Sequence, residues 1–214
     1  MEQGTEEWHA ARLGKATASR IADIIARTKS GYSTSRANYA AQLVCERLTG
    51  VAADSFINAA MQWGSEKEPE AQRLYEFEHD AEVVKVGFID HPRIVMSGAS
   101  PDGFVGDTGL VEIKCPITAT HIETVLGRSV PGKYLAQMQW QMAVTGRQWC
   151  DFVSYDPRLP LHLRLYVRRV HRDDALIEEL EGEVIGFLVE IDATLAKLQD
   201  VACLDEVAGQ RSAA

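Results

Sequence analysis

The sequence has no long apolar run, no clustered cysteines and no excess of basic residues, and each absence removes a class of protein. No apolar run approaches the roughly 20 residues that a membrane-spanning helix needs. The acidic N-terminus has no signal-peptide pattern, so we expect a cytoplasmic protein without a membrane partner. The four cysteines are scattered without a Cys-x-x-Cys pair, which argues against a zinc or iron–sulfur site and favours buried free thiols.

The net charge is −9, which argues against a protein whose whole surface coats nucleic acid. A local basic channel is compatible with this charge, and a cluster of acids around a metal ion would contribute to it. The 214 residues are 46% hydrophobic and 25% charged, which is typical of a globular chain with its own core. Because no repeat or linker interrupts residues 1–214, we predict a single domain with a frayed polar tail over the last ten residues.

The most informative stretch extends from Ser100 to Pro116. Asp102 lies between a proline and a glycine, which is typical of a turn. Gly106 and Gly109 flank Asp107 and predict the tip of a hairpin.

Residues 110–115 then alternate apolar and charged side chains, which predicts a short strand with Glu112 and Lys114 on one face. Two carboxylates at such a junction, Asp102 and Glu112, are suited to hold a hard divalent cation through oxygen ligands. A lysine beside them can orient a water, help to deprotonate it or stabilise charge on a phosphate. On this pattern alone, an ordinary surface hairpin with a Glu/Lys pair remains the alternative.

The N-terminal region predicts two helices, from Thr5 to Arg12 and over residues 20–26, with Thr17 or Ser19 as the cap of the second. A serine at a helix N-terminus with Arg12 close by suits an anion site. The alternative, favoured without further context, is a plain cap with a solvated arginine.

A longer helix is predicted over residues 59–77, with a break or kink at Pro69. Helical spacing places Met61 and Glu68 along one side. The alternative for Glu68 is a solvated acid between Glu66 and Glu70.

The other elements follow from periodicity, and together they predict an α/β fold with a mixed central sheet flanked by helices. We expect further helices over 37–49, 117–126, 134–145 and 174–201, strands over 82–89, 94–97, 149–155 and 162–170, a polar loop at 29–35 and a connector at 54–58.

Short motifs follow one another from Glu2 to about Val170: Glu2-Gln3-Gly4, Trp8-His9, Arg12-Leu13-Gly14, Thr17-Ala18-Ser19, Trp63-Gly64, Glu68, Ser100-Pro101-Asp102-Gly103, Glu112-Ile113-Lys114-Cys115-Pro116, Tyr134, Ala136-Gln137-Met138-Gln139 and Tyr155-Asp156-Pro157-Arg158. In order and spacing they resemble the phage lambda-exonuclease type of alkaline exonuclease, also called the YqaJ-like viral recombinase nucleases. That family belongs to the restriction-endonuclease-like superfamily marked by PD-(D/E)xK. The resemblance implies a restriction-endonuclease-like core.

The resemblance also implies an activity. Such an enzyme is a processive exonuclease that degrades one strand of linear duplex DNA from the 5′ end and leaves a 3′ single-stranded overhang. It needs Mg²⁺ or Mn²⁺, with two ions per site bracketing the attacking and leaving oxygens, and no ATP.

The roles of the acidic residues and the lysine follow from the same resemblance. Asp102, Glu112 and Glu68 would ligate the metal ions with help from the backbone carbonyl of Ile113. Lys114 would position or activate the attacking water.

Four residues would form the pocket for the 5′-phosphate of the DNA end: Arg12, Ser19, Ser100 and Gln137. This agrees with the anion-site interpretation of Arg12 and Ser19. The pocket would supply binding energy and register, so that each cut recreates its own substrate.

Met61 falls where the family has an apolar wedge between the first base pairs, although it suits a core position equally well. Tyr134 would support the site or contact DNA. The family forms ring-shaped homotrimers, works with a single-strand annealing protein, and suggests a phage or prophage origin in a bacterial host. The chain beyond Val170 matches the family only as a generic helix.

Two other functions remain open. One is a different nuclease of the superfamily, either an endonuclease or an exonuclease with an iron–sulfur cluster, and the scattered cysteines argue against the latter. The other is a non-catalytic DNA-end-binding protein. The presence of all four residues Glu68, Asp102, Glu112 and Lys114 argues against it, because a nuclease fold without activity need not keep them.

Overall fold

The computed structural model describes the backbone of residues 2–53 and 59–212, and side chains as far as Val201. The predicted connector at 54–58 lies outside the described residues. No helix in the described part of the chain combines the length and the apolar character that crossing a bilayer requires.

A mixed sheet of five strands lies at the centre of the fold, in the order β10-β9-β8-β7-β4. Strands β8 and β9 pair in parallel, with Glu112 opposite Phe152, and the other pairs are antiparallel. A parallel pair needs a crossover connection, and two helices provide it, α5 (Thr118–Gly127) and α6 (Gly132–Thr145). The five strands are β4 (Val83–Val84), β7 (Gly103–Val105), β8 (Gly109–Lys114), β9 (Trp149–Tyr155) and β10 (Leu165–His171).

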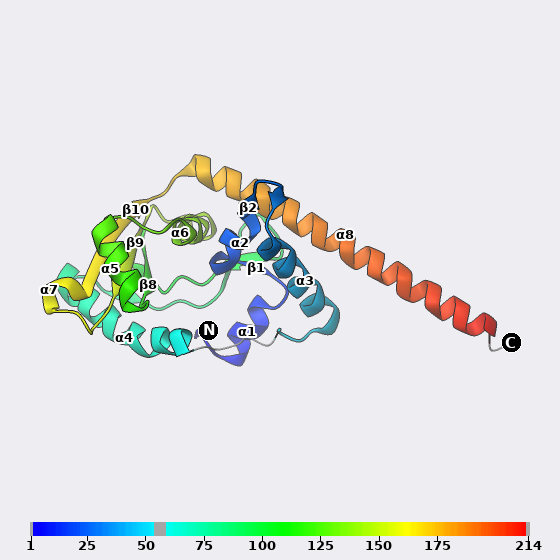
Figure 1. Ribbon diagram of the computed structural model, residues 1–214, viewed down its shortest axis with the longest axis horizontal. Helices are drawn as coiled ribbons and strands as arrows, with labels where there is room; N and C mark the ends of the chain where they lie inside the picture. Colours follow the sequence, from blue (N-terminus) through cyan, green and yellow to red (C-terminus); the bar gives the residue numbers. More distant parts are fainter. Residues whose placement is uncertain (1, 54–58, 213–214) are drawn as a thin grey trace.

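Helices cover both faces of this sheet, so the α/β prediction is confirmed (Figure 1). Helix α4 (Ala59–His79) packs Ala71 and Tyr75 against Val111 and Ile113 of β8. Helix α6 packs against the opposite face. There its Met138 and Met142 lie with Leu110, Cys150 and Phe152. Glu112 therefore emerges toward α6, because alternate residues of a strand point to opposite faces.

The N-terminal half forms a second body of helices and short strands against α6. Its core includes Ile21, Tyr39, Trp140 and Phe187. A small sheet, β1-β6-β5, borders it, and β2 and β3 form a separate hairpin. The elements are α1 (Glu6–Arg12), β1 (Ala16–Thr17), a 3-10 turn (Ala18–Arg20), α2 (Ile21–Ile25), β2 (Arg27–Thr28), β3 (Gly31–Tyr32), α3 (Thr34–Thr49), β5 (Ile89–Asp90) and β6 (Ser97–Ala99).

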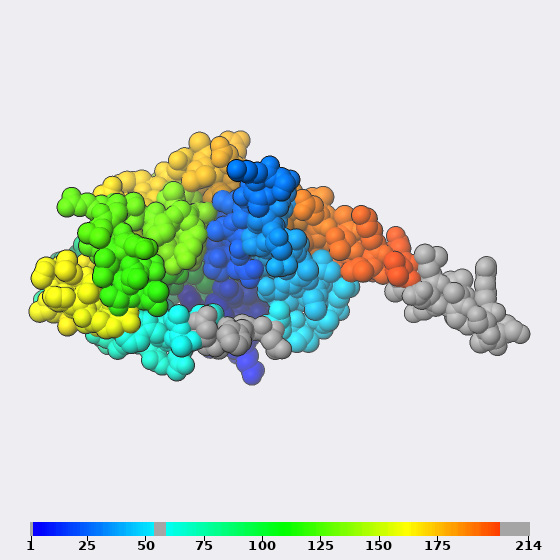
Figure 2. All heavy atoms as spheres, viewed as in Figure 1, coloured from blue at the N-terminus to red at the C-terminus, as the bar shows by residue number. Residues whose placement is uncertain are grey.

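Helix α8 (Asp174–Ser212) packs its first half on this body and then extends beyond it (Figures 1 and 2). Its buried face includes Val184, Phe187 and Ile191. The sequence placed the end of this helix at 201, whereas the backbone stays helical to Ser212.

Several predicted boundaries were wrong for local reasons. The expected strand 82–89 is two strands in different sheets, because the carbonyl of Val86 between them accepts from the side chain of Gln3 rather than from a neighbouring strand. Strand β6 begins only at Ser97, because Met96 has a left-handed φ of 62°. The polar loop 29–35 contains β3 of the small hairpin.

Proline placement explains two further corrections. Helix α4 continues through Pro69 without a break, since the carbonyl of Ser65 that loses its helical partner lies on the exposed side. Residues 162–164 belong to a helical turn, α7 (Leu161–Arg164), that begins at Pro160, and β10 starts after it. The expected side-chain cap before α2 is absent, because a 3-10 turn leads into that helix and neither its cap Thr17 nor the cap of α2 makes a side-chain capping bond.

Helix α8 is anchored by Phe187, whose ring is fully buried and stacks on Tyr39 at 5.5 Å. We expect Phe187→Ala to lower the free energy of unfolding by about 3–5 kcal/mol, because it leaves a cavity between α3 and α8. Urea denaturation measures this. The matched control on the same helix is Val189→Ala, which changes a 62% exposed side chain and is expected to stay within about 0.5 kcal/mol of the wild type. Equal effects of the two substitutions would contradict this anchoring role.

Candidate active site

The β7–β8 hairpin brings the predicted acids and the lysine together. Its tip lies at Gly106, where φ is +53°, and Asp102 precedes β7 at the opposite end of the hairpin. The backbone N–H of Ile113 donates to Oδ2 of Asp102 at 2.6 Å, which fixes this carboxylate beside the end of β8. Lys114 forms an ion pair with Glu112, as two charged side chains on one strand face are expected to do.

Glu112 is the most enclosed carboxylate of this group, with 1% of its surface exposed. Two glutamine side chains of α6 donate to it, Gln137 Nε2 to Oε1 at 2.7 Å and Gln141 Nε2 to Oε2 at 2.6 Å. With Lys114, both carboxylate oxygens have partners. A buried carboxylate is tolerated only when it is paired and hydrogen-bonded in this way.

The charges of this group shift one another's protonation equilibria. Burial and then the Glu112 carboxylate raise the pKa of Asp102 well above its ordinary value, Glu68 adds to the effect, and Lys114 acts against it. Burial disfavours the charge of Lys114, but the carboxylates of Glu112 and Asp102 outweigh it and raise the pKa of this lysine. Lys114 is therefore a cation at neutral pH in this arrangement, suited to orient a water or stabilise phosphate charge.

Glu68 lies on α4, where its carboxylate accepts from Lys85 Nζ at 3.0 Å. Both residues line a cavity of about 460 Å³ together with Glu2, Gln3 and Val86. The Gln3 amide donates to the carbonyls of Val86 at 3.0 Å and Pro101 at 2.7 Å. The N-terminal segment is thereby tied to the residue before Asp102, and the Glu68 carboxylate is near enough to Asp102 to help raise its pKa.

A second cluster joins Trp8, Arg12 and Ser100. The Arg12 guanidinium carbon lies 4.0 Å from the centre of the Trp8 ring, and Nη1 of Arg12 donates to Ser100 Oγ at 3.2 Å. Trp8 Nε1 donates to the same hydroxyl at 2.9 Å. Burial lowers the pKa of Arg12, and among the described residues no carboxylate forms a salt bridge with it. Arg12 therefore places a guanidinium that is in no salt bridge against Ser100, two residues before Asp102.

The other residues predicted for the phosphate pocket lie differently. Gln137 donates to Glu112 and so belongs to the acidic group. Ser19 is exposed, and its hydroxyl lies 3.5 Å from that of Thr17. None of the hydrogen bonds among the described residues joins Ser19 to Arg12 or Ser100.

Tyr134 flanks the site from α6, and Met61 lies near the start of α4. The Tyr134 ring centre lies 5.4 Å from Lys114 Nζ, and the ring stacks on Phe152 at 5.5 Å, so this tyrosine flanks the lysine from α6. Met61 is 50% exposed near the start of α4, which removes the core position as an explanation for it.

Sequence reasoning missed two residues of the site, Gln141 and Trp8. Gln141 follows Gln137 by four positions, a spacing that places both amides on one face of a helix. Trp8 precedes Arg12 by four positions in α1, and the same rule applies to that pair. The spacing was visible, but nothing local indicated which distant carboxylate or hydroxyl these side chains would meet.

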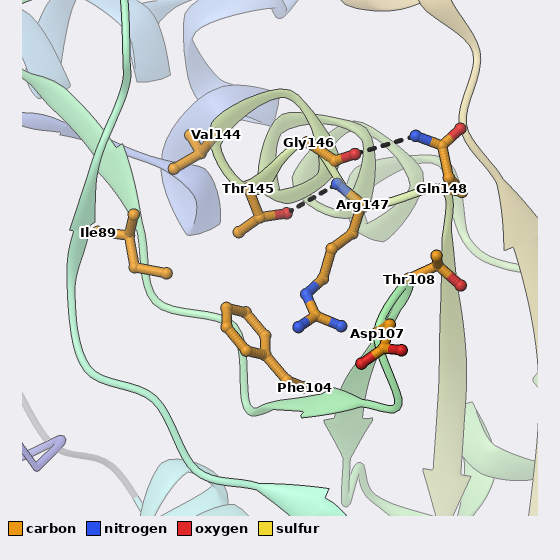
Figure 3. A pocket seen from close by; sticks show the side chains of 9 residues that line it. All are labelled: Ile89, Phe104, Asp107, Thr108, Val144, Thr145, Gly146, Arg147 and Gln148. Carbon is orange, nitrogen blue, oxygen red and sulfur yellow. Dashed lines mark hydrogen bonds between the residues drawn. The ribbon is translucent and has the colours of Figure 1, made fainter.

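The pocket shown in Figure 3 lies at the other end of the hairpin and contains none of the predicted site residues. It measures about 390 Å³ and lies between the tip of the hairpin and the end of α6. Arg147 extends across it, stacks on Phe104 at 3.8 Å and donates to the carbonyls of Gly106 and Gly109 at 2.7 and 2.8 Å. These contacts brace the hairpin tip.

The donor chemistry of the acidic group suits a hard divalent cation. Carboxylates of Asp102, Glu112 and Glu68 and the carbonyl of Ile113 are oxygen ligands of the kind that Mg²⁺ and Mn²⁺ take. Burial first, and then repulsion from the Glu112 carboxylate, raises the pKa of Asp102, and a cation would relieve the repulsion. Among the described residues no three acidic, His or Cys side chains converge as a ready metal-binding group. Two amides and Lys114 contact Glu112, and Lys85 contacts Glu68.

A mixed sheet between helices, with two acids and a lysine at the end of a hairpin, is a restriction-endonuclease-like fold, and solved structures agree. An alkaline exonuclease from Laribacter hongkongensis is 56% identical to this chain, with a TM-score of 0.87, over 93% of this chain and 98% of that one. Its complex with dAMP aligns with a TM-score of 0.88 at the same identity and coverage. A phage-related exonuclease from Haemophilus somnus shares the fold at 17% identity, with a TM-score of 0.71 over 86% of this chain and 96% of that one.

The family model of the YqaJ-like viral recombinase domain matches residues 7–148, so the chain belongs to this family. The resemblance to the lambda-exonuclease type is thereby confirmed, and it supports a nuclease function with DNA as substrate. No curated protein matches the chain.

The raised pKa of Asp102 predicts a stability effect with a definite sign. A carboxyl whose folded pKa lies above the unfolded value stabilises the fold fully only below the unfolded pKa, and this contribution is lost as pH rises through the folded pKa. We therefore expect Asp102→Asn, which keeps an acceptor for Ile113, to raise the melting temperature at pH 7 without metal. The rise would be about 2–4 °C per kcal/mol of repulsion removed.

Differential scanning calorimetry at pH 7 and pH 4 checks this. The control is Asp90→Asn, at an exposed aspartate that pairs with Lys15. The gain from Asp102→Asn is expected to shrink at pH 4. A loss of stability at pH 7 would contradict the assigned repulsion.

Proposed function

We propose that this chain is a Mg²⁺- or Mn²⁺-dependent, ATP-independent, processive 5′→3′ exonuclease on linear double-stranded DNA. It would leave 3′ single-stranded overhangs for single-strand annealing recombination in the cytoplasm of a bacterial host. One observation carries the proposal. The acid and lysine group of Asp102, Glu112 and Lys114 lies beside a cluster, Arg12 with Ser100, whose guanidinium has no acidic partner among the described residues. The two clusters are suited to a reacting phosphodiester and a terminal phosphate.

The proposed reaction is hydrolysis of the phosphodiester that follows the first nucleotide. A water oxygen attacks phosphorus, the bond to the 3′ oxygen of the terminal nucleotide breaks, and that oxygen takes a proton. Bound cations, two per site, would lower the pKa of this water and offset charge on the phosphoryl oxygens. Asp102, Glu112 and Glu68 would hold them with the Ile113 carbonyl, and the Lys114 ammonium would orient the water or the phosphate oxygen.

The Arg12 and Ser100 cluster would set the polarity. A guanidinium stacked on Trp8 and a hydroxyl that it contacts present donors to a phosphate in a fixed direction. Cleavage leaves a new 5′-phosphate on the next nucleotide, so each cut recreates the group that the cluster binds. Ser19 on the exposed turn and Gln137 would reach the phosphate only with DNA in place. The dAMP bound by the relative is a mononucleotide, as such a reaction releases.

The wider assembly follows from the family. A homotrimeric ring around DNA would give processivity to a chain of net charge −9, because enclosure replaces electrostatic adhesion. Exposed Met61 would contact the first base pairs, and Tyr134 would keep Lys114 in place. A single-strand annealing protein would take the overhang. An endonuclease of the same superfamily would not require the cluster of Arg12 and Ser100, since it does not bind a terminal phosphate. A non-catalytic binding protein would not require the buried charges of Glu112 and Lys114.

Substitution of the catalytic group tests the chemistry. We expect Lys114→Ala or Asp102→Ala to reduce digestion of linear duplex by at least about 1000-fold, because electrostatic stabilisation of the transition state is lost, while binding to DNA ends persists. The assay uses duplex labelled at the 5′ or the 3′ end, with and without Mg²⁺, and a circular duplex to exclude an endonuclease. The matched control is the exposed Lys197→Ala, which should digest like the wild type. Undiminished cleavage by both site variants would refute the assignment.

Substitution of Arg12 separately tests the proposed recognition of the 5′-phosphate. Arg12→Ala is expected to erase the preference for 5′-phosphorylated over 5′-hydroxyl ends while leaving slow cleavage of either. Competition between the two duplexes in one reaction measures the preference. Arg93→Ala, at an exposed arginine paired with Glu181, serves as the control and should keep it. A variant of Arg12 that retained the preference would place the phosphate pocket elsewhere.

A further inference from the structure

Gln141 contacts the acidic group but has no part in the reaction proposed above. Its Nε2 lies 2.6 Å from Glu112 Oε2, and the side chain is wholly buried. Gln137, one helical turn earlier on α6, holds the other oxygen at 2.7 Å. One helix therefore holds both oxygens of the Glu112 carboxylate. Lys114 shares Oε1 with Gln137, whereas Gln141 contacts the other oxygen, Oε2.

Among the described residues, the Gln141 side-chain amide hydrogen-bonds only to Glu112. Its carbonyl oxygen is buried and has no hydrogen-bond partner within the described part of the chain. An unsatisfied buried acceptor is unfavourable, yet the reverse orientation would turn that oxygen toward the carboxylate. The adjacent stripe of the same helix, with Met138 and Met142, packs in the apolar core. A glutamine here serves the contact with Glu112 rather than the core.

We propose that Gln141 is a positioning residue that fixes the orientation of the Glu112 carboxylate for the binding of a divalent cation. The inference rests on the metal-dependent function proposed above. A carboxylate on a glutamate has free rotation about its last bond, and an amide at 2.6 Å removes it. Because the amide is neutral, it does so without reducing the negative charge that attracts the cation. Hydrogen-bond partners of metal ligands typically contribute about 10- to 100-fold to metal affinity.

The test compares two buried glutamines of the same helix. Gln141→Met removes the amide at Glu112 and keeps the length of the side chain. Gln139→Met is the matched control, because Gln139 is also buried, with 1% of its surface exposed, but does not contact Glu112. Its side chain donates to the His171 carbonyl at 2.8 Å and accepts from the backbone N–H of Asp173 at 3.0 Å. Isothermal titration calorimetry measures Mn²⁺ binding to the full chain without DNA.

We expect Gln141→Met to bind Mn²⁺ about 10- to 100-fold more weakly than the wild type. Gln139→Met should bind it as the wild type does, whatever its loss of melting temperature. Wild-type affinity in Gln141→Met, or the same weakening in both variants, overturns the positioning role. If Gln141→Met does not fold, Gln141→Asn replaces it. That variant keeps the amide but is one methylene too short to reach Glu112, and the same outcomes decide.

The wild type separates this inference from the function on which it depends. A wild type that neither binds Mn²⁺ nor digests 5′-labelled linear duplex refutes both. A wild type that does both, together with a Gln141→Met variant of equal Mn²⁺ affinity, refutes the positioning role alone.

Discussion

The rest of the structure depends on one buried carboxylate, Glu112, and on the donors that make its burial possible. An unpaired carboxylate in a protein interior would take up a proton or destabilise the fold. Here two amides of α6 and the Lys114 ammonium occupy its oxygens. This requires β8 to lie against α6 in one register, and the crossover through α5 and α6 to β9 supplies that arrangement. The placement of α6 beside β8 thus supplies the hydrogen-bond donors for the buried Glu112 carboxylate.

The group of Asp102, Glu112 and Lys114 lies in a fold with more than one apolar core. The sheet and α4 form one core and the N-terminal helices with α8 form another, and α6 contributes residues to the second as well as to the opposite face of the sheet. The second cluster spans them, since Trp8 and Arg12 of α1 reach Ser100 just before the hairpin. Gln3 adds a tie to Pro101. The cluster of Trp8, Arg12 and Ser100 and the acids are therefore fixed to each other by contacts between segments about 90 residues apart.

Local sequence predicted the parts of this arrangement that local physics determines. The alternation along β8, the turn at Asp102 and the periodicity of α6 were sufficient for those elements. Two-residue strands such as β4 and β5 carry too few residues for a period, and their division between two sheets depends on a distant Gln3. The same limit explains why Gln141 was not expected at the site. Helical spacing shows that two amides share a face, but only the tertiary fold shows that Glu112 lies in front of it.

The choice of neutral donors at Glu112 also bears on the charge of the whole group. An arginine in place of either glutamine would satisfy the same oxygens and would cancel the charge of the carboxylate. Amides satisfy the lone pairs and leave the charge, and among the described residues the salt bridges of these acids are those of Glu112 with Lys114 and of Glu68 with Lys85. Burial and then the charge of Glu112 raise the pKa of Asp102, so the ionised form of this carboxyl disfavours the fold. That imbalance is a cost to stability, and a site that takes up divalent cations requires it, because a group already neutralised by its own side chains would have little affinity left for Mg²⁺.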